Sequence, residues 1–172
     1  TALRCGRLLD VGCGTGEFLI TMHQAGWKVD GIDASETARQ EASRRYTVTV
    51  QSPEDWFASG DGEYDVVTFW HALEHLPDPH HYLRRVTSSM RDDGILMIGL
   101  PNWNSLDAEY YGPEWAAYDV PRHITHFTRD AIERLLVQHG LTISSTFGLP
   151  FDAFYISMLS EKNGDGSAMK GL

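Results

Sequence analysis

Short apolar runs alternate with segments of helical period along most of this chain. The runs are rich in Val, Ile and Leu and show little polar–apolar alternation, which is typical of strands buried on both faces of a sheet. Strands that alternate with helices favour a doubly wound α/β fold, with a mostly parallel sheet and helices on both of its faces. The predicted strands are residues 7–11, 28–32, 47–50, 65–69, 95–100, 141–147 and 151–159.

Start and stop signals mark the helices between these strands. Ser35, Ser52 and Thr128 each precede a helical pattern and are predicted N-caps, and Pro53 suits the first position of its helix. Gly140 is a predicted helix end. The predicted helices, caps included, are residues 17–25, 35–45, a short one from 52, 78–90 and 128–139. The stretch 101–127 has no clear period and is long for a connection, so we expect it to be functional.

A glycine-rich turn after the first predicted strand is the most specific chemical feature. Residues 8–17 read LLDVGCGTGE, and the second strand ends in an acid, Asp33. The carboxyl ends of parallel strands meet at one edge of a sheet, which is where a nucleoside binds in such folds. Glycines let the backbone approach a ligand without an intervening Cβ. Asp33 is placed to accept hydrogen bonds from both hydroxyls of a ribose.

The glycine spacing separates two classes of nucleoside ligand. A dinucleotide turn reads G-x-G-x-x-G, but the position of its third glycine is Glu17 here, and Gly16 comes one residue early. The run Asp10-x-Gly12-x-Gly14-x-Gly16 instead resembles motif I of the class I S-adenosylmethionine-dependent methyltransferases. A nicotinamide oxidoreductase is therefore disfavoured.

Further motifs extend this resemblance over nearly the whole chain. The family's marks are matched by YDVV at 64–67, WHALEHLPDP at 70–79, DGIL at 93–96 and PN at 101–102. DVPRH at 119–123 with HFT at 126–128 resembles a small bacterial-type branch of the family, with a D-x-P-R-H-x-x-H-F segment. The resemblance implies a Rossmann-like, seven-stranded sheet whose last strand is antiparallel. It is specific for the cofactor and says little about the methyl acceptor.

The resemblance also implies a cofactor site, residue by residue. The glycines would lie against the methionyl group, Asp10 would reach its ammonium, and Asp33 would bind the ribose. The residues expected to bind the cofactor are Asp10, Gly12, Cys13, Gly14, Gly16, Asp33, Ala34, Ser35, Ser52, Pro53, Glu54, Trp70 and His71. Ser52 replaces the aspartate usual in the family, and Trp70 could equally be a core residue.

Methyl transfer needs little chemical activation by protein groups, because the sulfonium methyl is already activated. Holding the acceptor in line in a dry pocket supplies most of the acceleration. An oxygen or nitrogen acceptor must also lose a proton, which a histidine can take. We predict His123 and His126, in the long segment 101–127, as the catalytic candidates. The alternative is that Arg122 pins this segment to an acid such as Asp119 or Glu114, and that the histidines are structural.

The sequence H-x-x-E-H at His71, Glu74 and His75 also needs interpretation. It matches an inverted zinc-peptidase motif, but it follows a strand of a cofactor sheet, which is the wrong context. Some methyltransferases place a metal at a related E-x-x-E-H site, where His71 here replaces the first glutamate. We favour hydrogen bonds by Glu74 and His75 that fix the turn, and predict no metal ligands.

Composition limits the partners and the compartment. The net charge of −10 argues against nucleic acid, since phosphates need a basic surface. The two cysteines, Cys5 and Cys13, imply no disulfide framework. We find no signal peptide and no apolar run long enough to cross a bilayer, so we predict a cytoplasmic protein with a small-molecule acceptor. Nothing indicates an oligomeric state.

The chain of 172 residues is most simply one methyltransferase domain, 1–159, followed by a polar, glycine-rich tail or interrupted loop, 160–172. We predict methyl transfer from S-adenosylmethionine, with S-adenosylhomocysteine as product. The main alternative is a module of the same fold that binds S-adenosylmethionine without turnover within a larger assembly.

Overall fold

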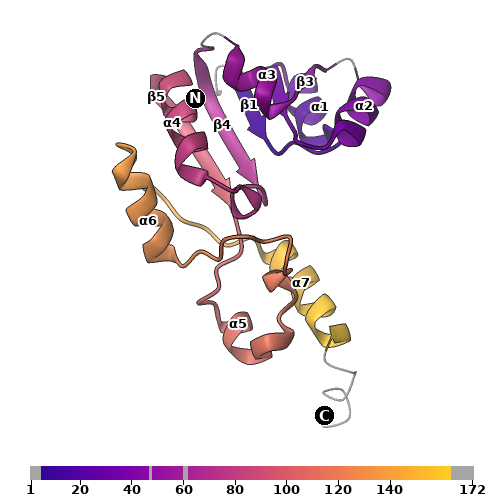
Figure 1. The fold of residues 1–172 in the computed structure, drawn as a ribbon, viewed down its shortest axis with the longest axis vertical. Coiled ribbons are helices and arrows are strands. Elements are labelled where there is room, and N and C mark those ends of the chain that lie inside the picture. Colours follow the sequence, from indigo (N-terminus) through magenta and orange to yellow (C-terminus); the bar gives the residue numbers. More distant parts are fainter. Residues whose placement is uncertain (1–4, 47, 60–61, 164–172) are drawn as a thin grey trace. The chain divides into compact units, whose positions relative to one another are not determined.

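The computed structural model describes residues 5–46, 48–59 and 62–163, which divide into two compact units (Figure 1). The first unit contains the described residues up to Leu73 together with 78–99, and the second contains 74–77 and the described residues from Leu100 onward.

The first unit is built on a five-stranded, fully parallel sheet in the order β3-β2-β1-β4-β5. Its strands are β1 (Arg7–Val11), β2 (Lys28–Ile32), β3 (Val50–Gln51), β4 (Tyr64–Trp70) and β5 (Met90–Gly99). This confirms the α/β, Rossmann-like class, whereas the expected seven strands are wrong for the described residues. β3 is shorter than the predicted strand 47–50, in which Thr47 lies outside the described residues.

β1 is the central strand, and its position explains its composition. The strand lies between β2 and β4, and Leu8, Leu9, Asp10 and Val11, whose side chains alternate between the two faces of the sheet, are all buried. Val11 is paired with Ile32 of β2 and with Phe69 of β4, so the carboxyl ends of these three strands lie level.

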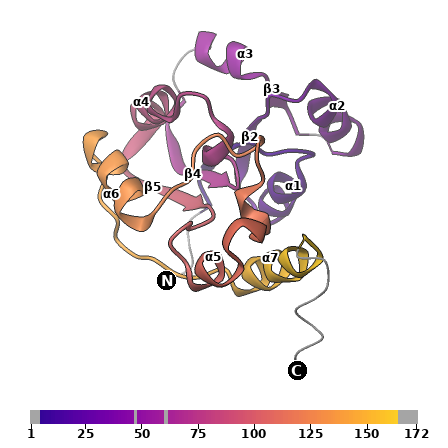
Figure 2. The same ribbon diagram turned by 60° about the horizontal axis from the view of Figure 1, so that its bottom comes forward.

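Four helices connect the strands: α1 (Glu17–Gln24), α2 (Glu36–Arg45), α3 (Pro53–Ala58) and α4 (Pro79–Ser89). α1 and α2 lie beside β2 and β3, and α4 lies beside β5 (Figure 2). The predicted N-caps are confirmed, since Ser35 accepts from Ala38 N at 3.2 Å and Ser52 from Asp55 N at 3.1 Å. α1 packs through Leu19 into a core that contains Leu8 and Val50.

The second unit is mainly helical. Its α-helices are α5 (Leu106–Tyr111), α6 (Arg129–Gln138) and α7 (Pro150–Asn163), with short 3-10 turns η2 (Gly112–Glu114) and η3 (Ala116–Tyr118) before α6. A further 3-10 turn, η1 (Leu73–His75), begins in the first unit and ends in the second. Trp115 and Ala117 form a small core with Ala108, against which Ile156 of α7 packs.

The end of the chain differs from the prediction. Residues 141–149 are in neither helix nor strand, and 151–159 are helical. Phe151, Phe154, Tyr155 and Met158 follow a period of three to four, which is the period of a helix, and Pro150 occupies its first position. α7 continues to Asn163, so it crosses the boundary predicted at 159. The remainder of the predicted tail lies outside the described residues.

Candidate cofactor site and histidine cluster

The glycine turn runs from the end of β1 into α1. Gly12, Gly14 and Gly16 all have positive φ, at 79°, 54° and 82°. A Cβ at Gly12 would lie 2.5 Å from the Ala72 Cβ, whereas one at Gly14 would meet no described atom within 4 Å. Gly12 is thus required by close packing, and Gly14 by its backbone conformation beside open space.

Asp33 ties the glycine turn to the start of α2. Its Oδ2 accepts a hydrogen bond from Gly14 N and its Oδ1 accepts one from Ser35 N, both at 2.8 Å. Each carboxylate oxygen has two lone pairs, so both oxygens can accept a further hydrogen bond from a ligand hydroxyl. The structure therefore brings together the turn and the acid that the sequence predicted as one site.

Arg39 binds the backbone of the segment that carries Asp33, and this role was not predicted. Its Nη1 donates to the carbonyls of Asp33 at 2.8 Å and Ala34 at 2.9 Å. The only signal in the sequence was a cation one helical turn after the Ser35 cap.

Asp10 is a buried carboxylate behind the glycine turn. Thr68 Oγ1 of β4 donates to its Oδ1 at 2.6 Å. Burial raises the pKa of Asp10 to about 6, the charge of Asp33 acts in the same direction, and the hydrogen bond from Thr68 opposes the rise. Thr68 was also missed, although it is the one polar residue in the run VVTFW.

A cavity of about 450 Å³ opens on the glycine turn. Phe18 and Trp70 form its aromatic wall, with ring centroids 5.8 Å apart and an edge-to-face orientation. It is lined by Asp10, Gly12, Cys13, Gly14, Thr15, Glu17, Phe18 and Trp70. These described lining residues include two carboxylates and no Lys, Arg or His. The cavity therefore suits a ligand with positive charge.

Cys13 contributes backbone to this cavity, not a reactive thiol. Its side chain is buried in the core with Leu19, and burial raises the pKa of the thiol well above its ordinary value. Its N–H donates to the carbonyl of Ile32 at 3.0 Å, which fixes the turn to the end of β2.

The remaining predicted cofactor residues surround the same sheet edge without lining the cavity. His71 has a φ of 50° and its N–H donates to Gly99 O at 2.9 Å, so the chain turns sharply as it leaves β4. Ser52 Oγ donates to Asp55 Oδ2 at 2.8 Å, which commits the hydroxyl to the cap of α3. Cofactor contacts by Ala34, Ser35, Ser52, Pro53, Glu54 and His71 stay predictions.

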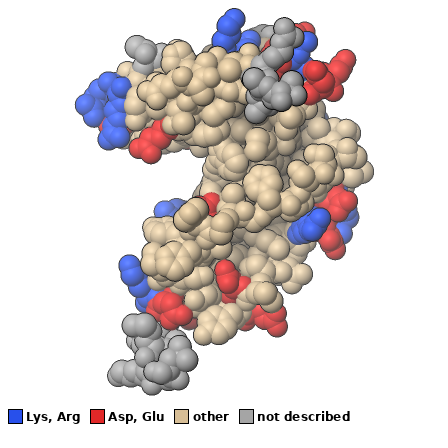
Figure 3. All heavy atoms as spheres, turned by 180° about the vertical axis from the view of Figure 1, so that it is seen from behind, with Lys and Arg blue, Asp and Glu red and all other residues tan. Residues whose placement is uncertain are grey.

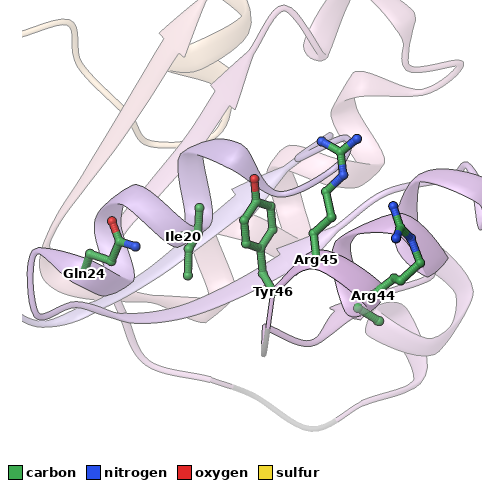
Figure 4. Close-up of a pocket in the computed structure, with 6 residues that line it drawn as sticks. Ile20, Gln24, Arg44, Arg45 and Tyr46 are labelled. Carbon is green, nitrogen blue, oxygen red and sulfur yellow. The ribbon is translucent and has the colours of Figure 1, made fainter.

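A second hollow, of about 570 Å³, lies between the ends of α1 and α2 (Figure 4). Gln24 lines it from α1, and Arg44, Arg45 and Tyr46 line it from α2 and its cap. Both arginines bind Glu41, whose pKa they lower to about 2. Their charges already have a partner, and the hollow is separate from the glycine turn.

In the second unit, His123 is held with one ring nitrogen free. Its Nδ1 lies 2.8 Å from the Ala117 carbonyl, which can only accept, so Nδ1 carries the proton and Nε2 has the lone pair. Nε2 lies 3.9 Å from Glu74 Oε1 and 3.8 Å from Asp119 Oδ2. Burial lowers the pKa of His123, while the Ala117 carbonyl and Glu74 act against it.

His126 is held differently. Its Nε2 donates to the Tyr118 carbonyl at 2.9 Å, and its ring stacks on Trp103 with centroids 6.5 Å apart. The imidazole thus belongs to the aromatic cluster of the segment 101–127, and Nδ1 is its accepting nitrogen.

Glu74, His75 and His123 each present a potential ligand atom, and these atoms all lie within 4.8 Å of one another. We call these three residues the Glu74 cluster. His75 Nδ1 lies 2.8 Å from the Arg122 carbonyl, and Arg122 itself binds Asp119 at 2.7 Å. The Arg122–Asp119 ion pair is the contact that the alternative interpretation expects, in which this segment is structural. The hydrogen bond to the Arg122 carbonyl confirms the predicted hydrogen-bonding role of His75. His71 is not part of the cluster.

Acidic and basic side chains are interspersed on one face of the molecule (Figure 3). On the face drawn in Figure 3, Lys and Arg side chains stand in small separate groups with acids beside them. Among the described residues, no helix combines the length and apolar character needed to cross a membrane. The cytoplasmic location stays a prediction.

Comparisons with known proteins agree with this geometry. A family described as "Methyltransferase domain" matches residues 2–146. The chain is 34% identical over 141 residues to a ubiquinone biosynthesis O-methyltransferase of Xanthomonas campestris, covering 77% of this chain and 59% of that protein. It is 34% identical to the protein of the same name from Thiobacillus denitrificans over 85% of this chain and 68% of that protein. The chain thus spans less than two thirds of the first of these relatives.

Solved structures show the same fold. Magnesium protoporphyrin IX methyltransferase from Synechocystis, with bound SAH, has a TM-score of 0.64 at 22% identity, over 81% of this chain and 66% of that one. A possible histamine N-methyltransferase from Thermotoga maritima has a TM-score of 0.65 at 20% identity, over 81% and 65%. With the glycine turn, Asp33 and the family match together, the chain belongs to the methyltransferase domain family, among the class I S-adenosylmethionine-dependent methyltransferases.

Proposed function

We propose that this chain transfers the methyl group of S-adenosylmethionine to an oxygen of a small-molecule acceptor and releases S-adenosylhomocysteine. The acid-lined cavity at the glycine turn carries the proposal. S-adenosylmethionine brings an ammonium and a sulfonium to such a site, whereas a dinucleotide would bring an anionic pyrophosphate. The relatives named O-methyltransferases favour oxygen over nitrogen as the acceptor atom.

In this proposal the first unit binds the cofactor. Asp10 would accept from the ammonium, Asp33 would accept from the ribose hydroxyls, and Trp70 would line the site near the sulfonium. Open space at Gly14, where a side chain would meet no described atom within 4 Å, supports a ligand against the turn. The adenine would lie against Ala34, Ser35 and the segment Ser52, Pro53 and Glu54.

A histidine is the proposed proton acceptor. The cofactor, when bound, provides a methyl group already activated on sulfur, so the chain must orient the acceptor and take its proton. We infer that His123 is the base, because its Nε2 has a lone pair and two carboxylates within 4 Å that stabilise the imidazolium. His126 is the second candidate, through Nδ1. The D-x-P-R-H-x-x-H-F segment would then mark a branch that uses this arrangement.

Calorimetric titration with S-adenosylmethionine, S-adenosylhomocysteine and NAD tests the cofactor. Binding of NAD alone would overturn the proposal. Release of S-adenosylhomocysteine with a panel of phenolic acceptors then tests turnover, and binding without turnover would support the non-catalytic module. If a chelator abolished turnover and a divalent metal restored it, the Glu74 cluster would be a metal site and His123 would not be the base.

A further inference from the structure

The hydroxyl of Thr68 is a buried contact to the acid proposed to bind the cofactor ammonium. Thr68 of β4 is paired with Asp10 of β1 in the parallel register, and both side chains are almost fully buried. Thr68 Oγ1 lies 2.6 Å from Asp10 Oδ1 and 3.4 Å from the Leu9 carbonyl. A hydroxyl has one hydrogen to donate, and the shorter contact to the charged acceptor takes it.

The surroundings of residue 68 favour an apolar side chain. Thr68 stands in a run of buried strand residues, where Val would fill almost the same volume. A hydroxyl in such a place is unfavourable unless it has a partner, and here the partner is Asp10.

The other charged groups around Asp10 do not favour its ionised form. Asp33 at the end of β2 and Glu17 at the start of α1 are acids, and Cys13 in the turn is a buried thiol. Among the described residues that line the cavity, none is a cation. Among the described residues, Thr68 is therefore the side chain that stabilises the Asp10 carboxylate before any ligand arrives.

We propose that Thr68 is a positioning residue of the cofactor site, which orients the Asp10 carboxylate and holds it ionised so that it can accept the ammonium group of S-adenosylmethionine. The inference rests on the proposed role of Asp10. Thr68 touches Asp10 and acts through it.

Thr68→Val and Thr68→Ser test this inference by titration with S-adenosylmethionine between pH 5 and pH 8. A hydrogen bond to a charged acceptor shifts the acceptor pKa by about one pH unit or more. For Thr68→Val we expect affinity to fall about tenfold at pH 6 and about threefold or less at pH 8. The pH at which affinity is lost on acidification should rise by about one pH unit. Thr68→Ser keeps the hydroxyl donor and should retain both the affinity and the pH dependence of the parent protein.

Two controls separate the possible failures. Thr87→Val removes a comparable hydroxyl, bonded to the Leu83 carbonyl of α4, and should change neither affinity nor its pH dependence. If Thr68→Val does not fold, Thr68→Ala removes the donor with a smaller side chain. A pH-independent loss of affinity, or no loss, would overturn the role of Thr68. Unchanged affinity in Asp10→Asn would instead overturn the role of Asp10 in the proposed function.

Discussion

Replacement of Asp10 by Asn should stabilise the free protein while weakening cofactor binding. Asp10 is only 2% exposed, and burial raises its pKa from 3.8 to about 6. Because the folded-state pKa is raised, the stability gained by protonation is fully present below 3.8 and is lost as the pH rises through 6. At about 1.4 kcal/mol per pH unit, the ionised carboxylate destabilises the fold by about 3 kcal/mol at pH 8.

Asn removes this charge but keeps an oxygen that accepts from Thr68. We therefore expect Asp10→Asn to raise the free energy of unfolding by up to about 3 kcal/mol at pH 8, and by progressively less toward pH 4. Affinity for S-adenosylmethionine should fall about 10- to 100-fold, since a charge-assisted hydrogen bond is lost. Saturating cofactor should then reduce or reverse the difference in free energy of unfolding between the variant and the parent, because only the parent binds the cofactor tightly.

Urea denaturation from pH 5 to pH 8, with and without cofactor, and calorimetric titration measure these effects. Asp93→Asn is the matched control, because Asp93 is 90% exposed and its loss should change stability by no more than about 0.5 kcal/mol. If Asp10→Asn lowered the free energy of unfolding equally at every pH, the reasoning would be refuted. The Asp10 carboxylate would then stabilise the fold, not destabilise it.

Three further changes test the site. Asp33→Ala should weaken the binding of S-adenosylmethionine at least about tenfold and speed amide exchange at Gly14, whose N–H loses its acceptor; unaltered affinity would remove Asp33 from the site. Gly14→Val should block the cofactor, whereas Gly14→Ala should cost only about 1–2 kcal/mol of stability, seen in urea unfolding, because its Cβ meets no described atom within 4 Å; normal binding by the valine variant would mean that the cavity is not the cofactor site. His123→Asn should lower kcat about 10²- to 10⁴-fold with cofactor affinity intact. The parental kcat at saturating cofactor should decrease only at pH values below 6.5, because the pKa of His123 is lowered and the base is protonated only there. Full turnover in the variant would leave His126 as the base.

Local sequence determined the parts of the molecule that depend on nearest neighbours. The helix caps at Ser35, Ser52 and Thr128 formed as predicted, because a side-chain oxygen and an N–H three residues away suffice. The glycine turn was also predictable locally, since glycine adopts the positive φ observed at Gly14 without the steric cost of a Cβ.

Tertiary structure decided whatever needed residues distant in sequence. The run 151–159 was predicted as a strand paired with 141–147, although its apolar spacing also suits a helix. It is helical, and residues 141–147 join no ladder. Thr68 meets Asp10 only because β4 pairs with β1, across 58 residues. His123 joins Glu74 and His75 only because residues 122–125 bond back to η1. The sequence alone thus determined the cofactor turn and the family, whereas the state of Asp10 and the setting of His123 arise from burial and pairing that exist only in the folded chain.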